Sequence, residues 1–223
     1  MLVAIVVLAV ALAATVVVTA LGGGGGESTE TTPTAQPTTV DRLSPEQTAE
    51  ADDDASLPGE YVDLAAIYGG AYGTRPGTSA HVTYAMDYSP QGLPPAGGPH
   101  WGSAACGQDP SSSPPLCGPA PWGIYREPWP AETLVHNMEH AGVIVWYNTA
   151  DEDVIDQLET FATENLNDDV TLVLAPYPNM AMETVAITVW GRRDLMPATE
   201  LDLDRLQEFI DMLYCRFDPE GFC

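Results

Sequence analysis

The sequence HNMEHAGVIVWY (residues 136–147) places a histidine motif directly before a run of β-branched and aromatic residues. His136 and His140 are four residues apart, so they lie on one face if the backbone is helical. One helical turn with this spacing can supply two ligands to a metal ion. Residues 143–147 have the apolar and β-branched content of a strand. We therefore expect a helix over residues 131–140, followed at once by a strand.

Further elements follow on the C-terminal side. A helix is expected to begin near Asp151, because acidic residues in a first turn complement the helix dipole. Residues 170–174 and 185–190 read as strands, the second ending at Gly191, and residues 202–214 read as a second amphipathic helix. This order predicts an α+β domain: a small, mainly antiparallel sheet with two amphipathic helices on one face. The two consecutive strands disfavour a doubly wound α/β fold.

The N-terminal side of the domain is less regular. Residues 81–85 read as a short strand. Residues 89–130 are rich in proline and glycine, which break regular structure. A segment of this length in a compact domain is usually functional or disordered. Because it carries His100, Trp101 and Trp122, we expect a long loop that is ordered and packed.

Three regions differ in composition. Residues 1–21 are apolar and long enough to span a bilayer, which predicts an N-terminal transmembrane anchor, with a cleaved signal peptide as the alternative. Residues 22–58 begin with five glycines and continue with Thr, Pro, Ser and acidic residues, the composition of a flexible linker. Residues 59–223 form the folded domain. Its acidic, cysteine-bearing character points to the extracytoplasmic side of the cell membrane, in a single-pass protein.

The charge of the chain limits its partners. The net charge is −25, with seven arginines and no lysine among 223 residues. Such a surface repels nucleic acid and anionic lipid headgroups. We therefore expect no nucleic-acid partner, and contact with the membrane through the N-terminal helix alone.

The four cysteines are expected to form disulfides. Cys106 and Cys117 flank a Pro/Ser-rich segment, and Cys215 and Cys223 enclose the C-terminal residues. No C-x-x-C motif is present, which disfavours a zinc ribbon or a thioredoxin site. Four cysteines allow three connectivities. We expect the local pairs, 106 with 117 and 215 with 223, with cross-pairing as the alternative.

All four histidines of the chain lie within residues 81–140: His81, His100, His136 and His140. Neutral imidazole is a good ligand for zinc, copper, nickel and iron. Four such ligands complete a tetrahedral shell, whereas three leave an open position. The sequence therefore predicts that these histidines meet at one metal ion.

The methionines favour copper over zinc as that ion. Thioether sulfur is a soft ligand that selects Cu(I). Met138 lies inside the histidine motif, and Met180 and Met182 have the spacing that places both sulfurs on one side of an extended chain. These three residues are candidate additional ligands, with core packing as the alternative role. A copper-binding domain for metal handling or delivery is the leading interpretation, with zinc next.

Glu139 allows a second interpretation. Residues 136–140 match the H-x-x-E-H pattern of inverted zinc proteases letter for letter. In a metal-dependent hydrolase, His136 and His140 would bind zinc and Glu139 would activate water as the general base. The alternative is that Glu139 supports a metal ligand by a hydrogen bond or belongs to a salt bridge. A third interpretation is a non-catalytic binding module, in which the histidines are structural and the aromatic residues of the long loop contact the ligand.

Three segments resemble a known family: PPAGGPH at residues 94–100, GIYREP at 123–128 and LVHNMEHAGV at 134–143. They resemble a bacterial and archaeal family catalogued as domain of unknown function 3105 (DUF3105), over about residues 78–223. That family has Pro-Pro-x-Ser-Gly-Pro-His and His-Asn-x-Glu-His-Gly-Gly motifs, so this chain departs from it at Gly97 and at Ala141, and by the 106–117 segment. The resemblance implies an exported or membrane-anchored protein that keeps these histidines. It implies no particular activity.

Overall fold

The structure is a computed structural model that describes residues 53–69, 81–102, 118–216, 218 and 221–223. The predicted anchor, most of the predicted linker and the Cys106–Cys117 pair lie outside these residues. None of the helices in the described ranges has the length and apolar character needed to cross a bilayer.

A six-stranded sheet forms the core, with the strand order β1-β8-β7-β5-β6-β4. Its strands are β1 (Glu60–Tyr61), β4 (Gly123–Ile124), β5 (Val143–Asn148), β6 (Leu172–Pro176), β7 (Thr184–Val189) and β8 (Arg192–Pro197). A separate two-stranded sheet pairs β2 (His81–Val82) with β3 (His100–Trp101). The helices are α2 (Leu64–Tyr68), α3 (Ala131–Glu139), α4 (Glu152–Asn167) and α5 (Leu203–Leu213), with short 3-10 turns η1 (Ser89–Gln91) and η3 (Ala198–Glu200).

The sheet is mixed. Strands β1, β8, β7 and β5 pair antiparallel, whereas β5, β6 and β4 pair parallel. The predicted α+β class with a sheet core is therefore confirmed. The parallel part was not predicted: β4 is only two residues long and lies in the Pro/Gly-rich segment, and β5 and β6 were expected to belong to a mainly antiparallel sheet.

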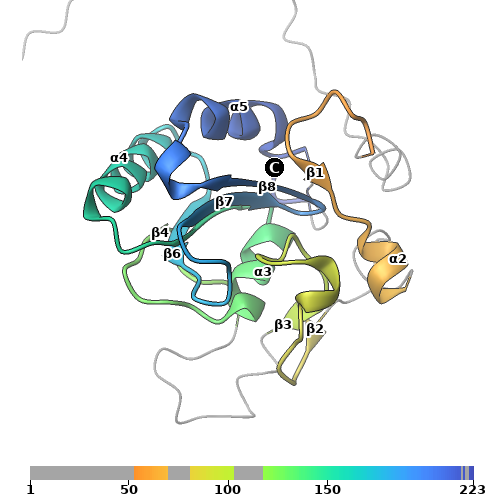
Figure 1. Ribbon diagram of the computed structural model, residues 1–223. Coiled ribbons are helices and arrows are strands. Elements are labelled where there is room, and N and C mark those ends of the chain that lie inside the picture. The colour runs from red at the N-terminus through yellow and green to blue at the C-terminus, as the bar shows by residue number, and fades with distance from the viewer. Residues whose placement is uncertain (1–52, 70–80, 103–117, 217, 219–220) are drawn as a thin grey trace, which may run out of the picture. The chain divides into compact units, whose positions relative to one another are not determined.

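The two crossovers of the parallel part place helices on both faces of the sheet. The chain passes from β4 through α3 to β5, and then back through α4 to β6, which lies between those strands. Because such crossovers are right-handed and these two run in opposite directions, α3 and α4 must cover opposite faces. Figure 1 shows α4 and α5 over one face and α3, with the β2–β3 pair beyond it, over the other. Asn165 Nδ2 donates to Gln207 Oε1 at 3.0 Å, which links α4 to α5.

The two amphipathic helices begin where their acidic residues indicate. Asp151 caps α4 by accepting a hydrogen bond from the backbone N–H of Asp153, and Asp202 caps α5 by accepting from that of Arg205. Side-chain caps of this kind satisfy backbone donors that have no partner within the helix. The apolar stripes of both helices are buried against the sheet.

Strand β8 is the longest strand that the sequence analysis did not predict. Gly191, read there as the end of a strand, is the turn of a hairpin: its φ of 81° is left-handed, and Val189 pairs with Arg192 across it. The strand opens with Arg192, Arg193 and Asp194, which is poor strand composition. These charges are buried because each finds a distant partner, as with Arg193 and Glu60 or Arg205 and Asp194.

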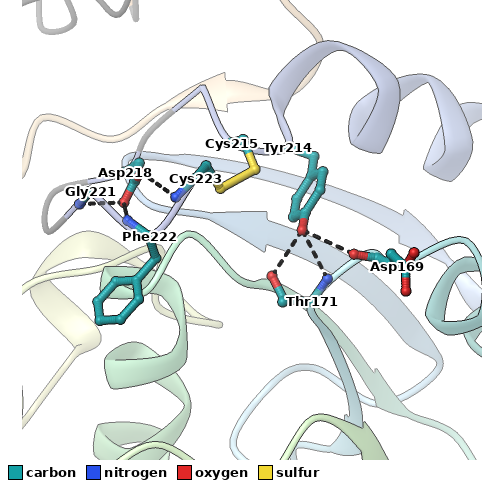
Figure 2. The surroundings of a disulfide bond; sticks show 8 residues. All are labelled: Asp169, Thr171, Tyr214, Cys215, Asp218, Gly221, Phe222 and Cys223. Atoms are coloured by element: carbon teal, nitrogen blue, oxygen red, sulfur yellow. Dashed lines mark hydrogen bonds between the residues drawn. A yellow bond between two sulfur atoms is a disulfide. The ribbon is translucent and has the colours of Figure 1, made fainter.

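The C-terminal residues form a disulfide-closed loop, which confirms the predicted Cys215–Cys223 pair. Asp218 organises the loop from within. Its carboxylate accepts from the backbone N–H groups of Gly221, Phe222 and Cys223 at 2.6, 2.7 and 2.7 Å (Figure 2). At the other end, the hydroxyl of Tyr214 donates to the carbonyl of Asp169 at 3.3 Å, which holds the loop against the start of β6.

Replacing both cysteines, Cys215→Ser with Cys223→Ser, should lower the free energy of unfolding by about 2–3 kcal/mol, because the cross-link restricts the unfolded chain. Denaturant titration of the oxidised wild type and the double variant measures this difference. A loss below about 1 kcal/mol would mean that the cross-link strains the folded loop as much as it restricts the unfolded one.

Candidate metal centre

The β2–β3 pair brings the first two histidines together. The two strands are parallel, and their register sets His81 directly opposite His100. Side chains at paired positions lie on the same face of a sheet, so the two rings are neighbours. His100 is fully buried, whereas the side chain of His81 is 34% exposed.

Helix α3 supplies the other two groups. His136 and Glu139 are three residues apart, which places them on one face of the helix, and this helix packs against β3. His81, His100, His136 and Glu139 each offer one ligand atom, and these four atoms lie within 4.8 Å of one another. We call these four residues the His/Glu cluster. Its three imidazole rings have centroids 5.0 Å apart in every pairing.

Backbone carbonyls orient two of the rings. His100 Nδ1 lies 2.8 Å from the carbonyl of Gly98, and His136 Nδ1 lies 2.7 Å from that of Trp101. A carbonyl oxygen only accepts, so both Nδ1 atoms carry the hydrogen, and each ring in its neutral form presents its Nε2 lone pair to the cluster. Metal-binding histidines are oriented in this way by a hydrogen bond from their other nitrogen.

Glu139 directs one oxygen into the cluster. Its Oε2 lies 2.9 Å from His100 Nε2 and 3.1 Å from His81 Nε2. Burial raises the pKa of this carboxyl, but the hydrogen bond with His100 and the charges that the histidines carry when protonated, His100 first, outweigh burial and hold the pKa below its usual value. A neutral His100 and an ionised Glu139 would face each other as two acceptors, so this contact requires a proton or a cation.

His136 is held neutral. Burial, followed by the neighbouring charge of His100, lowers its pKa to about 4. A metal ligand must be in its deprotonated form, and this ring already is at ordinary pH.

His140 lies beside the cluster and outside the group of four. It caps the C-terminus of α3, and its Nε2 is 3.2 Å from His136 Nε2. Its ring stacks on Phe222 of the disulfide loop, with centroids 4.2 Å apart and planes at 23°. Figure 2 shows the Phe222 side chain extending from that loop. The motif therefore places an i, i+3 pair in the cluster, His136 with Glu139, and sets His140 at its edge.

The methionines occupy other positions. Met138 is fully buried in the hydrophobic core, about 160° around α3 from His136. Met180 is buried in the same core, and Met182 is 75% exposed. Burial in the core matches the packing role for Met138 and Met180, and Met182 lies on the surface, so the argument for Cu(I) loses its support.

Asn137 is a site residue for which the sequence analysis gave no role. It is fully buried, its Oδ1 accepts from the backbone N–H of Ala120 at 2.8 Å, and its Nδ2 donates to the Ala120 carbonyl at 2.9 Å. The side-chain amide therefore makes both hydrogen bonds with the backbone of Ala120 that a neighbouring strand would otherwise make. No local pattern reveals this role, because the partner lies 17 residues away.

We expect Asn137→Ala to lower the free energy of unfolding by about 2–4 kcal/mol, because it leaves the buried N–H and C=O of Ala120 unpaired. Thermal and denaturant unfolding measure the loss. Asn167→Ala, at an exposed position on α4, is the matched control and should change stability by less than about 0.5 kcal/mol. Equal losses in the two variants would contradict the assigned role.

Ala141, one of the positions at which this chain departs from the motif it resembles, has an unusual backbone conformation. Its φ is 61°, a left-handed conformation at the end of α3 that favours glycine. The motif that residues 134–143 resemble has glycine at this position. The backbone is therefore shaped for the family residue, and alanine adopts the same conformation here.

Comparison with known proteins identifies the family. A search of the curated proteins and a search of the solved structures found no match. The family model described as "Protein of unknown function (DUF3105)" matches residues 81–221, which include the whole His/Glu cluster. The chain therefore belongs to the DUF3105 family.

Proposed function

We propose that this chain is a membrane-anchored, extracytoplasmic metal-binding domain, and that the His/Glu cluster binds one divalent transition-metal ion. The observation that carries the proposal is the convergence of three imidazole nitrogens and one carboxylate oxygen within 4.8 Å. Two of those nitrogens are aimed by hydrogen bonds to the carbonyls of Gly98 and Trp101. Anchoring by residues 1–21 rests on the composition of that segment.

The donor atoms suit copper in its divalent state, with zinc as the alternative. Three nitrogens and one oxygen form a borderline to hard set, in which sulfur has no part. At such sites divalent copper binds more tightly than zinc when both are available. Ligands from β2, β3 and α3 would hold the ion from two sides, and four protein ligands would close the site, which suits handling or delivery of a metal better than catalysis.

The hydrolase interpretation receives less support from the position of Glu139. A general base must be free to take a proton from a metal-bound water. Glu139 Oε2 instead lies within 3.1 Å of the Nε2 atoms of both His81 and His100, where it would serve as the fourth ligand atom for a metal ion. Binding is therefore the function that this geometry favours.

Elemental analysis tests the proposal. The full chain is purified in detergent without chelators, incubated with Cu(II) or Zn(II), and desalted. We expect about one ion per chain in the wild type, no bound ion in His136→Ala, and wild-type content in Glu164→Gln, an exposed position on α4. One bound zinc ion and no copper would overturn only the preference for copper and would leave the metal site in place. No bound metal, or equal metal in His136→Ala, would overturn the site and leave the histidines structural.

A further inference from the structure

A cavity lies at the N-terminal end of α3, away from His136 and Glu139. It has a volume of about 420 Å³. Its walls come from the residues on either side of Tyr88, from the start of α3 and from the turn that follows β6. Small-molecule sites have volumes of roughly 300–1,000 Å³ and combine apolar walls with a few polar groups. Two carboxylates line it, the buried Glu132 and the exposed Asp87, together with the aromatic residues Tyr88, Trp129 and Tyr177 and the amide of Asn179.

Glu132 is the buried acidic group of this cavity. Only 7% of the residue is exposed. One oxygen, Oε1, accepts from the backbone N–H of Met86 at 2.8 Å. In the described part of the chain, Oε2 has no hydrogen-bond partner, and no Arg or His forms an ion pair with the carboxylate.

The unbonded oxygen of Glu132 is accessible from the cavity, so it can accept a hydrogen bond from a ligand there. Buried charges in proteins are normally paired or fully hydrogen-bonded, because removing them from water is costly. The first turn of α3 stabilises the charge in part through its dipole. That contribution supplies no hydrogen-bond donor to Oε2, so the acceptor remains available to a molecule in the cavity.

The cavity walls match a cation. Trp129 is held edge-to-face by Tyr125, with centroids 5.2 Å apart, and Tyr88 and Tyr177 are buried at 4% and 5% exposure. Burial, and then the charge of Glu132, raises the pKa of Tyr88, so this phenol stays neutral beside the carboxylate. Aromatic faces attract ammonium groups, and an ionised carboxylate adds a charge-assisted hydrogen bond.

We propose that this cavity binds a small primary organic ammonium compound, with the charged nitrogen on Glu132 and the alkyl part against Trp129. This site goes beyond the proposed metal-binding function and uses none of the residues of the His/Glu cluster. Glu132 and Glu139 are seven residues apart, about 10 Å along the helix axis, so the two sites can be tested separately.

Ligand-observed and protein-observed NMR titrations test the proposal on the full chain at about 150 mM salt, which screens the general attraction of an acidic surface for cations. The probes are n-butylammonium, tetramethylammonium and 1-butanol. We expect n-butylammonium to bind most tightly, since tetramethylammonium lacks N–H donors and 1-butanol lacks charge. The indole N–H signal of Trp129, assigned with Trp129→Phe, should shift on binding.

Substitution of Glu132 gives the decisive comparison. Glu132→Gln keeps an oxygen for the Met86 N–H and should weaken n-butylammonium binding at least about tenfold. Glu127→Gln, an exposed position in the preceding loop, should leave binding unchanged. If Glu132→Gln does not fold, Trp129→Leu provides the test, with a loss of binding expected. Equal affinities for n-butylammonium and 1-butanol, or equal weakening by Glu127→Gln, would overturn the proposal and leave only non-specific attraction.

Discussion

Metal binding should raise the melting temperature of the domain by about 5–10 °C when the free metal is 100 times its dissociation constant. Ligand that binds only the folded state adds stability by mass action, and the unfolded chain separates His81, His100 and the α3 pair. Differential scanning fluorimetry with and without Cu(II), and again after chelation, measures the shift. The shift should be reversed by chelation.

His100→Ala should abolish this shift. His100 is fully buried and its Nε2 contacts Glu139, so its removal takes out one ligand and the partner of another. Losing an outer hydrogen-bond partner alone costs about 10–100-fold in metal affinity, and losing a ligand should cost more. Glu164→Gln serves as the matched surface control and should keep the full shift. An undiminished shift in His100→Ala would mean that copper binds to the acidic surface instead.

Arg192→Met should lower the free energy of unfolding by about 3–5 kcal/mol, which is large for one substitution. Arg192 is 2% exposed, and its guanidinium donates to the carbonyls of Leu57, Pro58 and Gly59 at 3.1, 3.0 and 2.9 Å. Methionine fills a similar volume but leaves these carbonyls without a donor. Urea titration measures the loss.

Arg126→Met provides the comparison. Arg126 forms ion pairs with Glu152, Asp156 and Glu159 at 2.7, 3.0 and 2.6 Å, but its side chain is 48% exposed. Exposed ion pairs contribute about 0–1 kcal/mol, so this substitution should cost far less despite its larger number of charged partners. A loss as great as that of Arg192→Met would contradict the importance assigned to burial.

The fold was predictable where the local pattern and the tertiary environment agree. Helices α4 and α5 carry an apolar stripe and an aspartate cap, and strand β5 is buried and mainly apolar up to Tyr147 because both faces of the sheet are covered. Strand β8 and strand β4 were missed for opposite reasons. The charges of β8 are neutralised by partners such as Glu60, which is 133 residues away, and β4 is too short to carry any pattern.

The site was predictable in composition but not in arrangement. Three of the four histidines meet, as their clustering in residues 81–140 predicts. The i, i+4 spacing suggested His136 with His140, whereas the helix turns Glu139 inward and ends at His140. Which of two neighbouring helical residues faces a cluster depends on how the helix is rotated against β3, and that rotation is set by packing of the whole domain.

The burial of α3 has a kinetic consequence. Its residues 132–139 are all buried, so His136 and Glu139 cannot leave a bound ion without disturbing the core, and His100 is enclosed as well. His81 differs: it belongs to a two-residue strand and its side chain is 34% exposed. Release of an ion would therefore begin with dissociation of His81, and the lifetime of the complex would be set by this one solvent-facing bond.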